Sequence, residues 1–311
     1  MRLASLASLG SLLALPPRPC GVRHARVVCT LHDWPLVTSR TNARLKLVKK
    51  LHSRRQREKC DLVLLEGHRL VIDAVTTAGL APEFFVVHDA ALATPAGRQL
   101  AAVLRQFPPE RVLRAPAELI AELSDTETPQ GVLAVVPQRP RPLPPAPSLV
   151  LVCDAVGDPG NMGTLLRSAA GAGVGACLLA PGCCDPWGLK ALRAGMGAQF
   201  RLPVHPVASW ADASAMLGRW GCAVLAADAG GAESHFEVNW REASALVVGS
   251  EAHGLSEAVR NDPAVRLCRI PLGQADELPS GADASGVESL NAAVAGSVML
   301  FEAQRQRLQA N

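Results

Sequence analysis

The sequence predicts an α/β protein with two domains, in which the larger C-terminal domain is built on a mostly parallel sheet. From Ser148 onward, short apolar runs alternate with helical stretches, which is the pattern of parallel strands connected by helices. Before this region, residues 137–147 read PQRPRPLPPAP and contain six prolines, too many for a helix or a strand. We therefore place a linker at residues 138–147, a smaller N-terminal α/β domain at 38–137 and the C-terminal domain at 148–311.

The expected elements follow from local patterns of apolar residues. In the N-terminal domain we expect a basic helix that ends near Arg57, then a strand, a helix and a second strand, at Leu62–Leu65, His68–Thr77 and Phe84–Val87. The strands expected in the C-terminal domain are Leu149–Cys153, Ala176–Leu179, Ala223–Ala226, Ala245–Val248 and Val265–Ile270.

The first residues have the composition of a targeting segment. Residues 1–32 contain four arginines and no acidic residue, and leucines recur about one helical turn apart between Leu3 and Leu12. A basic, acid-free and amphipathic segment is typical of an organellar transit peptide. The apolar residues 3–15 leave a secretory signal as the alternative. We predict a transit peptide over residues 1–37.

Composition argues against a membrane span and against a metal site. The sequence has no run of about 20 apolar residues, which is the length that crosses a bilayer. Its nine cysteines are scattered without a CxxC pair, which indicates reduced thiols rather than a disulfide framework or a zinc site. Cys183 and Cys184 are adjacent, but neighbouring thiols alone do not make a metal site. We predict no metal and no membrane association.

One segment is far more basic than the net charge of +3 suggests. Residues 40–59 contain nine lysines and arginines, with Glu58 as the single acid. Such a local block predicts a surface for a polyanion such as RNA. The alternative is a solvated amphipathic helix, because Leu45 to Leu51 supply an apolar face. The residues that we predict to contact RNA are Arg44, Lys49, Lys50, Arg54 and Arg55.

A first polar segment follows the first strand of the C-terminal domain. A Gly/Pro turn after Asp154 leads into a helix near Asn161, at the carboxyl end of a strand, where α/β sheets bind ligands. Arg167 lies further along the same helix between Leu166 and Ala169, an apolar setting for a guanidinium. Arg167 is therefore either a structural arginine paired to a carboxylate or a ligand of phosphate or substrate.

Two further segments place polar residues after later strands. Gly249 comes directly after a strand, which allows a ligand to approach the backbone, and Glu251 follows it. Near the C-terminus, Ser289 is a natural N-cap for the last helix. Asn291 stands beside Leu290 in an apolar stretch, so we expect its amide to be buried with a hydrogen-bond partner.

The order of these segments is more specific than any one of them. DPGNMGTLLRSAAGAG, VVGSEAHG and GVESLNAAVA, with LRAGMGAQFRLPV between the first two, resemble the motifs of the SpoU (TrmH-like) RNA 2′-O-ribose methyltransferases of the SPOUT superfamily. Upstream, LEGHRLVIDAV and TPQGVLAVV look like the accessory substrate-binding domain of that family. The resemblance runs from about Ser39 to the C-terminus.

The resemblance implies a trefoil-knotted methyltransferase domain that acts as a homodimer and uses S-adenosylmethionine. Cofactor contacts are implied for the backbone around Gly249, Ile270 and Leu290. Catalytic and substrate-positioning roles are implied for Asn161, Arg167, Glu251, Ser289 and Asn291. Two features depart from the family pattern: Ser250 stands where many relatives carry Asn, and residues 272–285 lengthen a loop that is short in the family.

The function that follows is 2′-O-methylation of a ribose in structured RNA. The expected substrate is organellar large-subunit rRNA, rather than tRNA, with guanosine as a candidate nucleotide and the mitochondrion favoured over the chloroplast. One alternative is a tRNA 2′-O-methyltransferase. A second alternative is a catalytically inactive ribosome assembly factor that keeps the fold and binds RNA.

Overall fold

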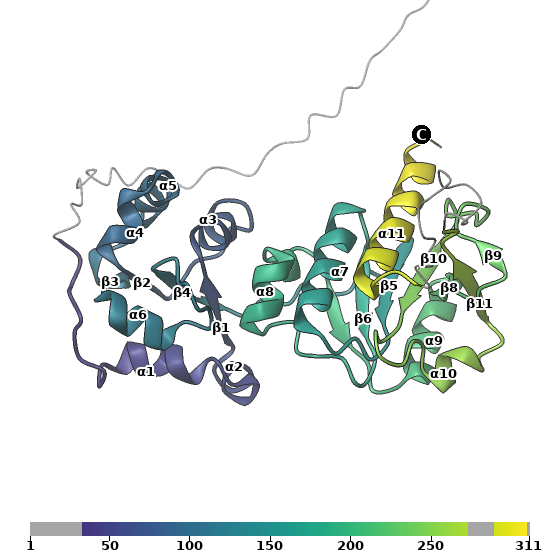
Figure 1. Ribbon diagram of the computed structural model, residues 1–311, viewed down its shortest axis with the longest axis horizontal. Coiled ribbons are helices and arrows are strands. Elements are labelled where there is room, and N and C mark those ends of the chain that lie inside the picture. The colour runs from purple at the N-terminus through teal and green to yellow at the C-terminus, as the bar shows by residue number, and fades with distance from the viewer. Residues whose placement is uncertain (1–32, 273–288, 310–311) are drawn as a thin grey trace, which may run out of the picture.

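The computed structural model describes residues 33–272 and 289–309, so residues 1–32 of the predicted leader (1–37) and nearly all of the lengthened loop fall outside the described residues (Figure 1). The N-terminal domain contains a four-stranded sheet in the order β1-β4-β2-β3. Its strands are β1 (Leu62–Glu66), β2 (Phe84–Val87), β3 (Val112–Arg114) and β4 (Val132–Pro137). β4 pairs antiparallel with β1 and β2, and β2 pairs parallel with β3.

The helices of this domain differ from the predicted pattern at its start. They are α1 (Ala43–Lys50), α2 (Arg54–Cys60), α3 (His68–Thr76), α4 (Asp89–Ala93), α5 (Pro95–Leu104) and α6 (Ala117–Leu123), with a 3-10 turn at Pro109–Arg111. The single basic helix that we predicted is wrong, because the chain turns between Leu51 and Ser53 and starts a second helix. Leu51 is fully buried at this turn, so packing rather than helix propensity sets the break.

The C-terminal domain confirms the predicted α/β class. Its seven strands lie in the order β7-β6-β5-β10-β8-β11-β9, and every neighbouring pair is parallel. β5 (Leu149–Cys153) and β6 (Ala176–Leu179) have the predicted bounds, and β8 (Ala223–Ala227), β10 (Ser244–Val248) and β11 (Val265–Arg269) differ by one residue. The short edge strands β7 (Val204–Pro206) and β9 (Glu233–Ser234) escaped prediction.

Helices cover both faces of this sheet. They are α7 (Pro159–Gly171), α8 (Leu189–Gly195), α9 (Trp210–Arg219), α10 (Glu257–Arg260) and α11 (Ala292–Leu308), with a 3-10 turn at Ala198–Phe200. Alternate residues of β5 face opposite layers: Leu151 packs with the α7 and α11 side, and Val152 packs with α9. α11 lies beside α7 (Figure 1), and a side chain at Gly296 would come within 2.6 Å of Leu165. The two helices are therefore in close contact.

The segment that follows β6 docks into the N-terminal domain. Trp187, Leu192 and Phe200 share one apolar cluster with Leu70 and Val71 of α3. The rings of Trp187 and Phe200 meet edge to face at 5.4 Å between centroids. The two sheets are thus joined by a common core and not only by the residues 138–148, which form no helix or strand.

Ion pairs reinforce this junction. The carboxylate of Glu66, 3% exposed, accepts a hydrogen bond of 3.0 Å from Arg193 of α8. Arg57 of α2 pairs with Asp185. Losing one member of such a buried pair leaves the other charge uncompensated, so these contacts specify how the two domains dock.

Candidate functional site

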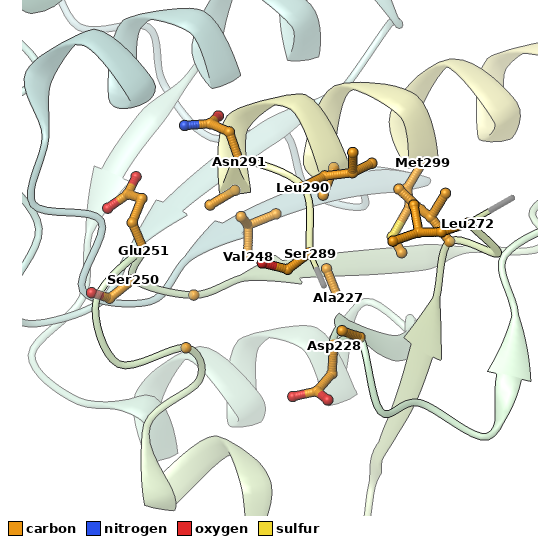
Figure 2. Close-up of a pocket in the computed structure, with 16 residues that line it drawn as sticks. Ala227, Asp228, Val248, Ser250, Glu251, Leu272, Ser289, Leu290, Asn291 and Met299 are labelled. Carbon is orange, nitrogen blue, oxygen red and sulfur yellow. The ribbon is translucent and has the colours of Figure 1, made fainter. Parts of the chain in front are cut away.

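A hollow of about 350 Å³ opens at the carboxyl ends of β8, β10 and β11 (Figure 2). Parallel strands present their carboxyl ends at one edge of a sheet, and this is where such folds bind ligands. Six of the predicted residues line the hollow: Gly249, Glu251, Ile270, Ser289, Leu290 and Asn291. The second and third polar segments are therefore brought to one place.

Gly249 is needed for the shape of its own loop. Ser250 and Gly254 exchange backbone hydrogen bonds of 2.9 and 2.8 Å, which turns the chain back on itself after β10. A Cβ on Gly249 would lie 2.5 Å from the carbonyl of Gly254, and Gly254 has a φ of +65°. Both glycines are thus required by local geometry. Close approach of a ligand to Gly249 remains a prediction.

A hydrogen-bonded chain of three side chains forms one flank of the hollow. The amide nitrogen of Asn161 donates to the carboxylate of Glu251. The amide nitrogen of Asn291 donates to Oδ1 of Asn161 at 3.2 Å. Figure 2 shows Glu251 and Asn291 on the same side of the hollow. Residues that are 90 and 130 positions apart in sequence thus fix one another.

Asn291, rather than Ser289, caps α11. Its Oδ1 accepts from the backbone nitrogens of Ala293 at 2.9 Å and Val294 at 3.2 Å. The prediction that Ser289 is the N-cap is wrong, because the helix begins three residues later, at Ala292. Asn291 is also exposed rather than buried, although its amide does have the partners that we expected. Ser289 lines the hollow as an exposed residue.

Asp158 accepts a hydrogen bond from the backbone of Asn161. As the N-cap of α7 it accepts from the backbone nitrogen of Asn161 at 2.9 Å, and its other oxygen pairs with Lys190 at 2.9 Å. The ammonium of Lys190, and then the Asn161 N–H, lower the pKa of the Asp158 carboxyl. The start of α7 is therefore anchored where it meets the hollow.

Sequence reasoning missed a second carboxylate of the hollow. Asp228 follows β8, opposite the Asn161 flank, and Figure 2 shows its side chain pointing away from Asn291. Its oxygens accept from Arg260 at 2.6 Å and from the backbone of Gly230 at 2.9 Å. The signal was present in the sequence, because Asp228 is a polar residue two positions after the predicted strand Ala223–Ala226.

Arg167 lies apart from this hollow within a single chain. It is exposed, and among the described residues it makes no hydrogen bond or ion pair with Ser289 or Asn291. The apolar setting that we predicted is wrong, because Leu165, Leu166 and Ala169 are buried on the inner side of α7 and Arg167 points outward. It lines a different hollow, between α7 and α3.

The basic segment is partly neutralised by its own fold. Arg54 pairs with Glu58 at 2.8 Å, and Arg44 donates to the backbone carbonyl of Glu110 while lying over the Phe84 ring at 5.4 Å. Leu45 and Val48 of α1 are buried, as the amphipathic interpretation predicted. Lys49, Lys50 and Arg55 remain exposed. Of the predicted RNA contacts, these three are the available cations.

Within residues 33–272 and 289–309, no three His, Cys, Asp or Glu side chains gather in an arrangement that could hold a metal ion. Burial raises the pKa of Cys183 to about 12 and that of Cys184 to about 11, so both thiols stay protonated near neutral pH. No helix in the same part of the chain is long and apolar enough to cross a membrane.

Comparison with known proteins defines the class to which this fold and site belong. Residues 148–301 match the SpoU rRNA Methylase family, and residues 42–134 match the MRM3-like substrate binding domain. The chain is 30% identical to the 23S rRNA (guanosine(2553)-2′-O)-methyltransferase RlmP of Bacillus subtilis, covering 85% of this chain and 97% of that protein. This chain therefore belongs to the SpoU rRNA methylase family.

Two further relatives place it more closely. It is 34% identical to the zebrafish (Danio rerio) protein named rRNA methyltransferase 3A, mitochondrial, over 82% of this chain and 66% of the zebrafish protein. A crystal structure of an AdoMet-bound rRNA methyltransferase from Sinorhizobium meliloti is 30% identical, with a TM-score of 0.68, covering 88% of this chain and 98% of that one. The chain thus spans both domains of a solved enzyme and about two thirds of the zebrafish relative.

Proposed function

We propose that this protein transfers a methyl group from S-adenosylmethionine to a ribose 2′-hydroxyl of large-subunit rRNA in the mitochondrion. The observation that carries the proposal is the convergence of Asn161, Glu251 and Asn291, from three separate segments, on one hydrogen-bonded flank of a strand-end hollow. The names of the zebrafish and Bacillus relatives support an rRNA substrate, and the Bacillus name supports guanosine.

The hollow has the chemistry that S-adenosylmethionine requires. Val248, Leu290 and Met299 supply apolar surface for an adenine ring. The carboxylates of Asp228 and Glu251 border the same space and complement a ligand that carries a sulfonium and an ammonium. Backbone groups of Gly249, Ile270 and Leu290 are the proposed cofactor contacts.

When bound, S-adenosylmethionine supplies a methyl group on a sulfonium that the ribose 2′-oxygen can accept without a metal. The protein must then position the hydroxyl and stabilise the charge that develops on its oxygen. We assign that stabilisation to Arg167, because a guanidinium stays protonated in proteins and so serves poorly as a base. Ser289 and Asn291, exposed at the hollow, are assigned to hold the ribose.

This assignment requires a second copy of the chain, because Arg167 does not reach its own hollow. α11 presents exposed apolar side chains at helical spacing along its outer face. They are Val294, Val298, Phe301 and Leu308, which are 39% to 68% exposed. A homodimer packed through this face would bury them. It would also bring α7 of one chain near the hollow of the other, so that each site combines one chain's hollow with its partner's arginine.

Two measurements test the proposed reaction. The purified chain is expected to bind S-adenosylmethionine in calorimetry without added metal. Mapping of 2′-O-methyl groups in mitochondrial rRNA with and without the protein is expected to reveal one lost site. Cofactor binding and RNA binding without any lost methyl group would favour an inactive assembly factor, and a lost site in tRNA would favour the tRNA alternative.

Mixed dimers test the shared site. Arg167→Ala chains and Ala295→Trp chains, in which the indole fills the hollow from α11, are each expected to be inactive alone. When the two are mixed, heterodimers should regain one working site and part of the activity. Mixtures that stay inactive, although heterodimers form, would contradict the shared-site assignment.

Three further proposals concern a transit peptide, the linker between the domains and a knot in the C-terminal domain. Residues 1–37 are proposed to be a transit peptide, and residues 138–147 the linker between the two domains. The knot expected for the C-terminal domain also remains a proposal. Import of a fluorescent fusion into mitochondria, compared with the same fusion lacking residues 1–37, tests the first of these.

A further inference from the structure

We infer that the hollow between α3 and α7 is a phosphate-binding subsite for the RNA strand beside the target nucleotide, and that Arg69 is its contribution from the N-terminal domain. The inference rests on the proposed function in one respect, namely that the ligand is RNA. It adds Arg69, which the catalytic assignment does not use, and assigns RNA phosphate binding to the hollow that Arg167 also lines.

The hollow is lined by three arginines, two of which have no partner among the described residues. It has a volume of about 420 Å³ and is lined by Arg69, Arg167 and Arg201, against a single acid, Asp73. Arg201 pairs with Asp73. Arg69 and Arg167 are exposed, and neither makes a hydrogen bond or an ion pair among the described residues. Two free guanidiniums from two different domains therefore face one concave space.

The floor of the hollow is built from small residues. Gly171, Gly195, Ala170 and Ala198 line it, so its walls leave room between the arginines. A Cβ on Gly195 would come within 2.9 Å of Gln199, so a larger residue could not stand there without a shift. On α1 and α2, by contrast, three of the arginines already have protein partners. A concave space with free guanidiniums suits the planar, bidentate binding of a phosphodiester.

The backbone position of Arg69 is held by contacts of its neighbours in sequence. It lies in the first turn of α3, directly after His68, whose ring nitrogens lie 3.2 Å from Gln130 Oε1 and 3.0 Å from the carbonyl of Ala91. Gly67, with a φ of +102°, starts the helix against Gln130. The two N-terminal segments singled out in the sequence, 65–75 and 128–136, therefore meet to place this arginine.

The junction between the domains sets the distance between the arginines. Glu66, just before α3, pairs with Arg193 of α8, and Asp73 of α3 pairs with Arg201. α8 in turn packs closely on α7, where a Cβ on Gly163 would lie 2.5 Å from the carbonyl of Ala191. The helices that carry the two arginines are thus held in place by the protein, so binding of a phosphate would need ordering of the two arginine side chains and not of the backbone.

The test compares Arg69→Gln with Arg105→Gln in the full chain. Arg105 is a matched control because it is exposed in the same domain, has no side-chain partner among the described residues and lies outside the hollow. Affinity for an unmodified transcript of the mitochondrial large-subunit rRNA is measured over a range of salt concentrations. Arg69→Gln should reduce the slope of log K against log[salt] by about 0.7 to 0.9 for the lost phosphate contact, and Arg105→Gln should leave it unchanged.

The variant Arg69→Lys and the affinity for S-adenosylmethionine serve as two further controls. Arg69→Lys should keep most of the salt slope, because the positive charge remains, while a weaker affinity would report the lost bidentate geometry. Affinity for S-adenosylmethionine should stay equal to that of the wild-type chain in all three variants. A change in cofactor affinity or in the unfolding midpoint for Arg69→Gln alone would show a structural role and overturn the inference.

The outcomes separate this inference from the proposed reaction. Equal salt slopes for Arg69→Gln and Arg105→Gln would overturn the subsite even if the wild-type chain methylates rRNA. A reduced slope in a chain that never methylates RNA would support the subsite and refute the reaction. A wild-type chain that does not bind the transcript would overturn the subsite outright.

Discussion

The two hollows on either side of α7 are built on opposite principles. At the strand-end hollow, the polar side chains of Asn161, Glu251 and Asn291 are hydrogen-bonded to one another. At the hollow facing α3, Arg69 and Arg167 have no such partners in the described part of the chain. The side chains of the strand-end hollow are held by one another. The hollow facing α3 presents free cations that an anionic ligand could neutralise.

This difference suggests that the two hollows bind different kinds of ligand. Mutual hydrogen bonds hold side chains in one geometry, which suits a small ligand whose reactive atom must be placed accurately. Free cations suit a flexible polyanion whose binding depends on counterion release and hence on salt. If the comparison is right, changes at the first hollow should alter cofactor affinity or turnover without salt dependence. Changes at the second should alter RNA binding with salt dependence.

The largest expected effect is that of Arg167→Ala, because Arg167 is the one residue assigned to both chemistry and RNA. Loss of its charge stabilisation should lower turnover by about 10²- to 10³-fold, a typical cost of removing one preorganised donor. Affinity for S-adenosylmethionine should be unchanged, because Arg167 is assigned to the ribose and phosphates of the RNA, while the cofactor contacts are assigned to Gly249, Ile270 and Leu290. Steady-state methylation of the rRNA transcript and calorimetry measure the two quantities.

Arg167→Lys sharpens the same test. A lysine keeps the charge but not the planar fork, so it should restore the salt slope and little of the turnover. Turnover near the wild-type value in Arg167→Ala would remove the catalytic assignment and reduce the residue to an RNA contact.

A smaller effect is expected from the apolar face of α11. Phe301→Glu and Val298→Asp should each weaken the proposed dimer and lower activity in proportion to the dimer lost, because burying a charge in an apolar interface is costly. Analytical ultracentrifugation over a range of protein concentrations measures the dimer. Phe236→Glu is a matched control, since Phe236 is 62% exposed and lies on a different element. A fully active monomer would contradict the shared site.

The hydrogen-bonded flank should give an effect of about tenfold. Asn161→Ala removes a hydrogen bond to Glu251 and one from Asn291, and an exposed pair of this kind contributes on the order of 1 kcal/mol. We expect weaker cofactor binding or slower turnover with an unaltered salt slope. Asn239→Ala breaks a similar exposed bond, of 2.9 Å to Glu242, away from the site and should leave both unchanged. A reduced salt slope of RNA binding in Asn161→Ala would contradict the proposed difference between the two hollows.

How much the sequence could reveal differs between these regions. β5 and β6 were predicted to the residue because a buried parallel strand is a continuous apolar run between turn signals. The polar segments at the strand-end hollow were singled out because polar residues after such strands meet at one edge, and the resemblance to the SpoU family then indicated the individual residues within them. Asp228 also follows a strand, but it was overlooked because its neighbours in sequence are alanines and glycines, which do not suggest a functional site.

Other features depend on packing that no local pattern encodes. The outward direction of Arg167 was missed because its sequence neighbours are apolar, yet they turn inward on α7 while Arg167 turns out. The break between α1 and α2 follows from burial of Leu51. The pairing of Arg57 with Asp185 joins residues 128 positions apart, so the amount of unpaired positive charge in the basic segment could not be read from its composition.

The smallest expected effect concerns Asp158, which tests whether the strand-end hollow depends on charge at all. Lys190 and the N–H of Asn161 lower its pKa in the folded chain. A lowered folded pKa means that the stabilisation is present above the unfolded pKa of about 3.9 and is lost as the pH falls through the folded value. Because both partners are exposed, the contribution should be below about 1 kcal/mol. Asp158→Asn keeps an N-cap oxygen and removes only the charge.

Urea unfolding at pH 7 and at pH 3 measures this effect. The wild-type chain should be slightly more stable than Asp158→Asn at pH 7, and the gap should be smaller at pH 3, because the stabilisation is lost as the pH falls below the unfolded pKa and through the lowered folded pKa. Lys190→Gln should remove most of the gap at pH 7, since the mutant cycle then has no ion pair to lose. If the gap is large and insensitive to Lys190, Asp158 anchors Asn161 by geometry alone. The charge of Asp158 would then contribute nothing to the organisation of the strand-end hollow. The contrast with the hollow between α3 and α7, which is lined by free arginines, would be even larger than proposed.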